Sequence, residues 1–190
     1  YNEVENFNIY GNERYIYQYI SEKYPEVEVK FDTEKIKLTT IDIEVASENG
    51  FPDVESCAEE VLLITLQDYA TKQIRTWGRG AFNNKQDNVI YKGFNTEYEL
   101  LTDFIHWWMI EDNTPEVITG WNSKLYDIPY LCRRIDRILG EKLKKRMSPW
   151  GLVTEEETYI SGRKHLSYDI GGVSQLDYLD LYKKFTYKAQ

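Results

Sequence analysis

The chain has 190 residues, 42% of them hydrophobic and 15% aromatic, which suits one globular domain and argues against disorder. Its 23 Lys and Arg stand against 32 Asp and Glu, and the net charge of −9, taken as a total, argues against a nucleic-acid binder. No apolar run approaches the ~20 residues of a membrane-spanning helix, and two cysteines are too few for a disulfide framework, so we expect a reducing compartment.

Residues 1–34 are rich in tyrosine and in acidic side chains. We interpret them as the end of a preceding domain, with residues 35–190 forming the next one. A surface on which tyrosines stack nucleic-acid bases is the alternative, although so acidic a stretch suits it less. Because the chain begins with Tyr1 rather than Met, we expect it to be a piece of a larger protein.

The segment 35–46 (KIKLTTIDIEVA) has the alternating pattern of a strand. Successive strand side chains point to opposite faces, so Ile41 and Ile43 belong to one face and Asp42 and Glu44 to the other. The sequence therefore predicts a strand with one buried face and one acidic face.

Periodicity and turn residues predict the elements that follow. Thr96 and Glu99 form a capping box, which predicts a helix that ends before Pro115. The other expected elements are strands at 61–69, 73–78, 88–92, 116–121 and 173–180, a helix at 128–139, a hairpin at 153–168 and a last helix. This succession is typical of an α/β domain with a mixed sheet and flanking helices.

Asp42 and Glu44 are the first candidate site residues. They lie two apart on the expected strand, so both carboxylates project from the same face. Two negative charges this close repel each other unless a cation lies between them, and hard divalent ions such as Mg²⁺ prefer oxygen ligands. The alternative is a solvated strand face that is simply acidic, which is the more common setting of such a pair.

Asp127 is the second candidate. It follows the strand at 116–121 after a short turn and comes directly before the helix at 128–139. The alternative for Asp127 is a helix N-cap, because Asp is favoured there and Pro129 suits a first turn. Asn122 is likewise a plausible turn residue.

Basic side chains gather in the last third of the chain. Residues 121–190 have a net charge of +4, whereas residues 1–60 have a net charge of −10. Within the helix at 128–139, the spacing places Arg133, Arg134 and Arg137 opposite the apolar stripe. A solvated helix face and a phosphate-contacting surface are about equally good explanations of this cluster.

Other catalytic chemistries have little support. The two histidines, His106 and His165, have no Ser or Cys partner in a recognisable setting, the cysteines lack zinc-ligand spacing, and the sequence has no Gly-rich phosphate loop. A hydrolase that acts on sugars through a carboxylate pair is conceivable. The basic residues after Asp127 fit a phosphate-bearing substrate better.

Three segments together resemble family B DNA polymerases. "DIEVASENGFP", with Asp42 and Glu44, resembles the first exonuclease motif of that family, and "TGWNSKLYDIPY", with Asn122, Tyr126 and Asp127, resembles the second. "LDYLDLYKKF" is similar to the segment that follows in replicative polymerases of T-even-type phages. The resemblance covers about residues 35–190, and it makes residues 1–34 the end of the polymerase's amino-terminal domain.

This resemblance implies a 3′→5′ proofreading exonuclease with a ribonuclease-H-like fold. In the family, two divalent ions, Mg²⁺ or Mn²⁺, activate a water and stabilise the leaving oxygen of the scissile phosphodiester. Carried over by motif, Asp42 would bridge both ions, Glu44 would hold the ion that activates the water, and Asp127 would hold the other.

The resemblance also implies a path for DNA. Phe51 would stack on the terminal bases, Asn122 and Tyr126 would line the strand, and the hairpin, with Arg163 and Lys164 by its turn, would help to shift a primer end. The implied partners are the single-stranded 3′ end of a primer, the rest of the polymerase chain, and a sliding clamp with other replisome proteins. The implied location is the cytoplasm, that of the bacterial host for a phage protein.

One motif of the family is missing from this chain. The third motif is Tyr-x-x-x-Asp, and no Tyr here has an Asp four residues later. We therefore expect the chain on its own to bind metal weakly and to cleave poorly. The alternatives are a free-standing ribonuclease-H-like exonuclease, which needs that third motif, and a non-catalytic binding or scaffold module, whose three carboxylates would not converge.

Overall fold

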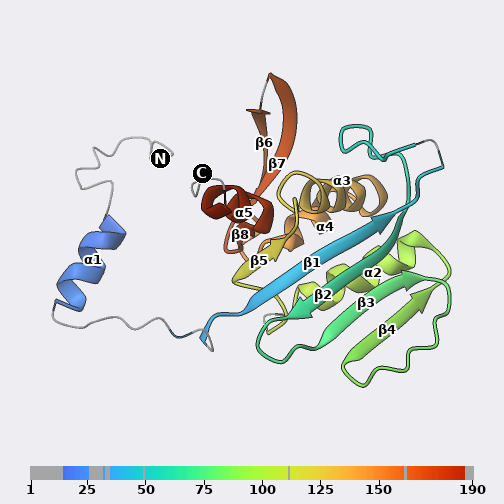
Figure 1. Ribbon diagram of the computed structural model, residues 1–190, viewed down its shortest axis with the longest axis horizontal. Helices are drawn as coiled ribbons and strands as arrows, with labels where there is room; N and C mark the ends of the chain where they lie inside the picture. The colour runs from blue at the N-terminus through green and yellow to red at the C-terminus, as the bar shows by residue number, and fades with distance from the viewer. Residues whose placement is uncertain are drawn as a thin grey trace. The chain divides into compact units, whose positions relative to one another are not determined.

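The structure, a computed structural model, describes residues 15–25, 32, 35–48, 50–110, 112–160 and 162–186, without the side chains of residues 15, 16, 160 and 163. The chain divides into two compact units, Tyr1–Thr33 and Glu34–Gln190. The first contains α1 (Tyr15–Lys23), a helix that the sequence patterns did not predict. The second contains the α/β fold drawn in Figure 1. No helix in the described ranges is long and apolar enough to cross a membrane.

Six strands of the second unit form one sheet in the order β4-β3-β2-β1-β5-β8. The pairs β1·β2 and β2·β3 are antiparallel, and the pairs β3·β4, β1·β5 and β5·β8 are parallel. The predicted mixed sheet is therefore confirmed, with β1 in its interior. The strands are β1 (Leu38–Val45), β2 (Val61–Asp68), β3 (Ile74–Arg79), β4 (Val89–Phe94), β5 (Val117–Gly120) and β8 (Ser174–Asp177).

The alternation predicted for β1 is confirmed. Ile41 and Ile43 are buried, and they pair across the sheet with the buried residues Leu66 and Ile64 of β2. Asp42 and Glu44 are exposed on the other face. The hydrophobic face of β1 thus fixes which way its two carboxylates point.

Helix α2 (Glu97–Trp108) covers the buried face of the sheet and lies behind the strands in Figure 1. Both bonds of the predicted capping box are present: Glu99 N donates to Thr96 Oγ1 over 3.2 Å, and Thr96 N donates to Glu99 Oε2 over 3.0 Å. At the other end of the helix, the indole of the fully buried Trp108 donates to the carbonyl of Met147 over 2.8 Å. Both ends of α2 are therefore fixed by side-chain hydrogen bonds.

Helix α3 (Asp127–Leu139) begins one residue before the predicted range and ends, as predicted, at Gly140, whose φ of +89° suits glycine. A short α4 (Glu141–Lys144) and a 3₁₀ turn η2 (Lys145–Met147) follow. The apolar stripe of α3 packs into the core, together with Cys132. Both cysteines of the chain, Cys57 and Cys132, are free and buried.

The predicted hairpin is present as β6 (Val153–Ile160) and β7 (Arg163–Ile170), which extends two residues beyond the expected end. Its eight cross-strand pairs form a two-stranded sheet separate from the large one. In Figure 1 the hairpin projects away from the large sheet.

The prediction of a strand over residues 173–180 is wrong for its last three residues. β8 ends at Asp177, and α5 (Tyr178–Thr186) begins with the next residue. The cause is the Asp177 carboxylate, which accepts the backbone N–H of Leu179 over 2.8 Å and so satisfies one of the unpaired donors in the first turn of the helix.

Candidate active site

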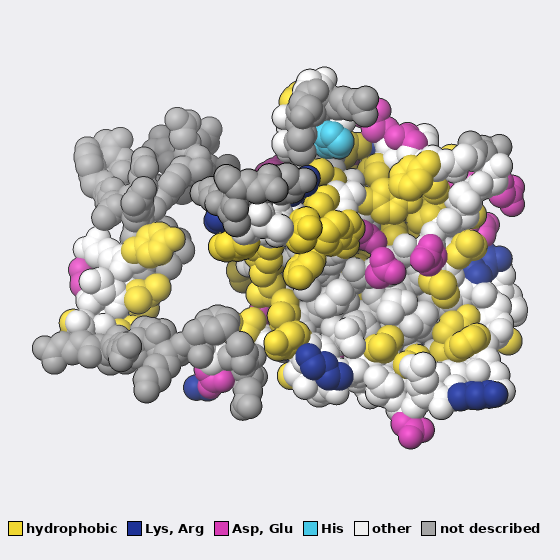
Figure 2. Space-filling view, viewed as in Figure 1, with side chains coloured by type: hydrophobic (Ala, Val, Ile, Leu, Met, Phe, Trp, Pro, Cys, Tyr) yellow, Lys and Arg dark blue, Asp and Glu magenta, His cyan; other side chains and the backbone are white. Residues whose placement is uncertain are grey.

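Two of the predicted carboxylates lie on the open face of the sheet. Asp42 and Glu44 are exposed, and they face away from the core that Ile41 and Ile43 enter. Figure 2 shows acidic side chains over β1 on this face, with hydrophobic side chains over the neighbouring α3 and β5. A charged ligand can reach this face of β1 directly.

Asp127 reaches β1 from the end of β5. The parallel pairing of β1 with β5 runs from Leu38 to Thr40, and beyond it the Ile43 N–H donates to Asp127 Oδ1 over 3.0 Å. Asp127 thus takes the acceptor position that a further β5 residue would occupy. The alternative explanation of Asp127 as a helix N-cap is wrong, because the N-cap position belongs to Tyr126 and carries no side-chain cap bond.

The backbone of Gly120, at the end of β5, passes close to the backbone of β1 before the turn that leads to Asp127. A Cβ on Gly120 would lie 2.7 Å from the carbonyl oxygen of Ile41 and 2.8 Å from the Cβ of Ser123. Glycine is therefore required at the point where β5 leaves β1. The next residues turn away and bring Asp127 opposite Ile43.

The charge of Asp127 is held in an unfavourable setting. Burial raises the pKa of Asp127 from 3.8 to about 6, the Ile43 hydrogen bond opposes this rise, and the negative charges of Asp42 and Asp177 add to it. The pKa of Tyr126 is raised mainly by burial, and further by the charges of Asp127 and Glu44. The charge of Asp42 thus acts on Asp127, and the charges of Asp127 and Glu44 both act on Tyr126.

The chemistry of these side chains fits a hard divalent ion. Three carboxylates supply oxygen ligands, and a cation would offset the cost of ionising the buried Asp127. The preassembled geometry is absent, however: within the described residues, no three His, Cys, Asp or Glu side chains are arranged as metal ligands.

Aromatic side chains lie beside Asp127. The ring of Phe51 is 5.4 Å from that of Tyr126, which is 5.8 Å from the ring of Tyr130. Phe51 is 85% exposed and belongs to the connection between β1 and β2. Phe51 thus offers an exposed ring against Tyr126, the residue before Asp127, and such a ring suits stacking with a nucleic-acid base.

Asn122 and Asp177 shape the turn that leads to Asp127. Asn122 has a φ of +60°, in the left-handed region that Asn tolerates well, which agrees with its interpretation as a turn residue. The buried Asp177 carboxylate accepts the N–H of Asn122 over 3.0 Å and that of Lys124 over 2.9 Å. The sequence did not single out Asp177, although an Asp directly before a helix is an N-cap signal.

The arginines of α3 are not placed as predicted. Arg134 is 5% exposed and forms an ion pair with Glu97, with a 2.6 Å distance between Nε and Oε1, so its assignment to an exposed helix face is wrong. The positions follow the helical period, but the connection between β1 and β2 covers this side of α3. Arg133 and Arg137 remain more accessible, and each donates to backbone carbonyls of that connection.

Lys164, by the hairpin turn, has acidic neighbours. Lys164 Nζ lies 2.6 Å from Glu157 Oε1 and 3.8 Å from Glu55 Oε1, and its side chain stays partly exposed. The side chain of Arg163 lies outside the described part of the structure. Lys164 can exchange its partners for a phosphate, because exposed ion pairs are weak.

Known proteins match this chain over most of its length. A family model described as the exonuclease domain of DNA polymerase family B matches residues 3–189. The chain is 32% identical to the DNA-directed DNA polymerase of Escherichia phage RB69, over 90% of this chain and 22% of that protein. It is 33% identical to that of Enterobacteria phage T4, over 89% and 21%.

A DNA polymerase from a human virus also matches. The chain is 32% identical to the DNA polymerase catalytic subunit of human herpesvirus 6A, over 78% of this chain and 15% of that protein. The chain thus spans about a fifth of the length of the phage polymerases it matches.

Proposed function

This chain belongs to the exonuclease domains of family B DNA polymerases, and we propose that it serves a longer polymerase as its 3′→5′ proofreading exonuclease. Its six-stranded mixed sheet with flanking helices agrees with the ribonuclease-H-like fold of that family. The proposed reaction is hydrolysis of the phosphodiester of a mispaired 3′-terminal nucleotide.

The placement of Asp42, Glu44 and Asp127 around one residue of β1, Ile43, supports this proposal. Two come from the exposed face of β1, and the third contacts the backbone of the residue between them. Exonuclease domains of this family are in general metal-dependent, and divalent ions held by these carboxylates would activate a water and stabilise the leaving 3′ oxygen. Asp42 would bind both ions, Glu44 the ion next to the water, and Asp127 the other.

The aromatic residues would hold the end of the DNA strand. Phe51 and Tyr126 would receive the terminal bases by stacking, which is tolerant of sequence because every base has a π-face. Asn122 would line the path from the turn before Asp127. A melted, unpaired end reaches these rings more readily than a paired one, and this difference would select mispaired ends.

The surroundings of the site favour the same partner. Arg163 and Lys164 would face the phosphates of the incoming strand, whereas the backbone hydrogen bonds of Arg133 and Arg137 and the burial of Arg134 give these three a structural role. The rest of the polymerase chain, and through it a sliding clamp and other replisome proteins, would be the protein partners. For a phage protein, the host cytoplasm would be the place of action.

We expect the chain without its polymerase to be weakly active. A Tyr-x-x-x-Asp motif is missing from this sequence, and the family uses it for a further ligand and for a Tyr that orients the water. With fewer ligands, the carboxylates would bind divalent ions more weakly.

The experiment is trimming of a 3′-labelled single-stranded oligonucleotide with Mg²⁺ or Mn²⁺. We expect little product from this chain, clear trimming by the polymerase that contains it, and loss of at least about 10²-fold in that polymerase with Asp42→Ala. An exposed carboxylate on another edge of the sheet gives the matched control, Asp87→Asn, which should trim normally. Trimming by the polymerase that survives Asp42→Ala would contradict the proposed site and favour a binding or scaffold module.

A further inference from the structure

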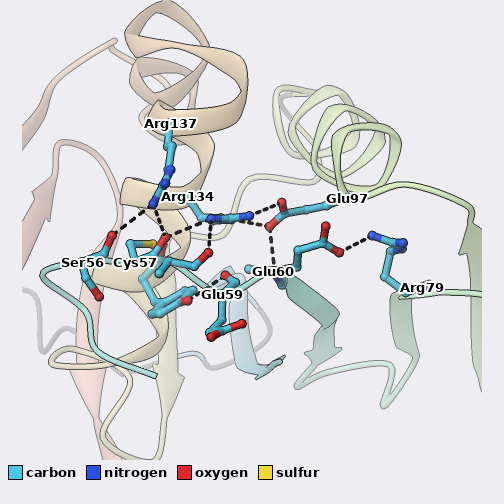
Figure 3. Close-up of polar contacts among 11 residues, drawn as sticks. Ser56, Cys57, Glu59, Glu60, Arg79, Glu97, Arg134 and Arg137 are labelled. Carbon is cyan, nitrogen blue, oxygen red and sulfur yellow. Dashed lines mark hydrogen bonds and ion pairs between the residues drawn. The ribbon is translucent and has the colours of Figure 1, made fainter. Parts of the chain in front are cut away.

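The connection between β1 and β2 lies along α3 and is bound to it through successive carbonyl groups. Each carbonyl from Glu55 to Glu59 accepts a hydrogen bond from a side chain of this one helix. Figure 3 shows the bonds from Arg134 and Arg137. The donors are Arg133 to Glu55 (2.9 Å), Arg137 to Ser56 (3.2 Å) and Cys57 (3.0 Å), Arg134 to Cys57 (2.9 Å) and Ala58 (3.1 Å), and Tyr130 to Glu59 (2.8 Å).

Arg134 is the centre of this arrangement. Its Nε and Nη2 bind the two carboxylate oxygens of Glu97 over 2.6 and 2.7 Å, while its Nη1 reaches the connection. Glu97 Oε1 also accepts the N–H of Val61 over 2.8 Å, which fixes the first residue of β2. One buried ion pair therefore joins α2, α3 and the end of the connection.

The backbone of the connection is strained where these bonds meet. Cys57 has a φ of +45°, which a non-glycine residue adopts at a cost. Its N–H donates to the carbonyl of Asp53 over 2.9 Å, and its carbonyl accepts from both Arg134 and Arg137. Such a conformation persists only where the surroundings over-determine it, so the arginines hold a shape that the connection would not keep by itself.

Phe51 belongs to the same connection and depends on its shape. The residue is 85% exposed, and its ring contacts Tyr126 at the start of α3. Little burial holds such a side chain in place, so its position is set by the backbone that carries it.

We propose that Arg133, Arg134 and Arg137, together with Glu97, form a clamp that positions Phe51 against Tyr126, the residue before Asp127, to receive the 3′-terminal base. This inference rests on the proposed function and gives these residues a role through the protein backbone. The clamp orders the connection during folding, so the DNA end does not bear that entropic cost when it binds. Loosening the clamp therefore weakens binding of the DNA end more than it slows the chemical step.

The test uses the polymerase that contains this chain, with single-stranded DNA ends as the substrate. Arg137→Gln removes two carbonyl bonds from an exposed position, and Arg134→Lys keeps the buried charge but loses the forked geometry. Lys85→Gln, in the exposed loop between β3 and β4, is the charge-matched control. Trimming rates give KM and kcat, and the fluorescence of a 3′-terminal 2-aminopurine reports stacking of the terminal base.

We expect the clamp variants to raise KM about fivefold or more, the scale of one lost base–aromatic stack, with kcat changed less than about twofold. The 2-aminopurine should lose its quenching, and Lys85→Gln should leave all three readouts unchanged. Adding Phe51→Ala to Arg137→Gln should raise KM no further, because both changes remove the same stack.

Two results would overturn the clamp. One is an unchanged KM in Arg137→Gln and in an Arg134→Lys protein whose thermal unfolding shows an intact fold. The other is a full multiplicative effect of Phe51→Ala on top of Arg137→Gln. The proposed function fails on a separate result, namely undiminished trimming by the Asp42→Ala polymerase.

Discussion

At the scale of a single residue, the hydrogen bond and the charge of Asp127 favour opposite environments. Its Oδ1 completes the hydrogen bonding of Ile43 in β1, which requires the side chain to be buried. Burial in turn raises the pKa of its carboxyl group to about 6 and makes its ionised form costly. A cation beside the carboxylate relieves that cost, so the same placement that stabilises the strand also favours metal binding.

This conflict predicts how stability depends on pH in EDTA. Because the folded-state pKa of Asp127 is raised from 3.8 to about 6, folding favours the protonated form, and the free energy of unfolding falls as the pH rises from about 4 through 6. Asp127→Asn keeps an acceptor for Ile43 and removes the charge. The variant should therefore be more stable than the wild type at pH 7, by up to roughly 3 kcal/mol.

Urea unfolding between pH 4 and pH 8 checks this expectation. The gain should vanish near pH 4, where the wild-type carboxyl is protonated too. Asp87→Asn, at an exposed loop position, serves as the control and should not change the pH profile. A variant that is less stable than the wild type at pH 7 would show that the Asp127 charge is not costly.

The positions of the three carboxylates were predictable to different degrees. Asp42 and Glu44 follow from local alternation, because Ile41 and Ile43 alone decide which face of β1 is buried. The bond from Ile43 to Asp127 joins residues 84 positions apart, and no local pattern contains it. Local patterns therefore left Asp127 as either a candidate site carboxylate or a helix N-cap, and the resemblance to the family grouped it with Asp42 and Glu44.

At the scale of elements, the largest departure from expectation concerns α3. Helical periodicity gave its boundaries and its apolar stripe correctly, because those depend on the helix itself. It could not show that the connection from β1 to β2 covers the opposite side and buries Arg134. Burial alone would lower the pKa of the Arg134 guanidinium, but the hydrogen bonds and charge of Glu97 raise it, so the pair stays ionised.

The buried pair leads to a prediction for the packing of α2 on α3. Arg134→Met and Glu97→Leu should each lower the free energy of unfolding by about 3–5 kcal/mol, because each leaves an uncompensated buried charge. The double variant removes both charges, so its loss in free energy of unfolding should be smaller than the sum of the two single losses. It should not recover fully, since Val61 then lacks an acceptor for its N–H.

A double-mutant cycle by urea unfolding measures this coupling. The pair Arg79 and Glu60, which is partly exposed, provides a control cycle with an expected coupling of at most about 1 kcal/mol. Additive losses in the cycle of Arg134 and Glu97 would mean that the two side chains act independently.

At the scale of the whole molecule, the structure changes the interpretation of the charge distribution more than that of any other property. The net charge of +4 over residues 121–190 left a solvated helix face and a phosphate-binding surface as equally good explanations of the arginines of α3. In the structure, the arginines of α3 donate to backbone carbonyls, and Lys144 and Lys164 pair with Asp136 and Glu157. Much of the local positive charge therefore holds elements of the fold together, which a charge count cannot reveal.

Because Arg137 binds backbone carbonyls, we expect its replacement to change the salt dependence of DNA binding only slightly. For single-stranded DNA, a plot of the logarithm of the binding constant against the logarithm of the salt concentration has a slope of about −0.7 per phosphate contact. Arg137→Gln should weaken binding of single-stranded DNA while changing that slope by less than about half of one contact. Fluorescence anisotropy across a salt series measures both quantities, and a slope reduced by a full contact would restore Arg137 to the phosphate-binding surface.

The two cysteines have a practical consequence for following the connection between β1 and β2. Both are buried, and burial raises the pKa of the Cys57 thiol to about 11 and that of Cys132 to about 12. Labelling requires an accessible thiolate to attack the reagent, so both native side chains are poor targets at neutral pH. A single cysteine introduced at an exposed position of this connection can therefore carry a spectroscopic label in the otherwise native sequence, and its motion would report directly on the loop.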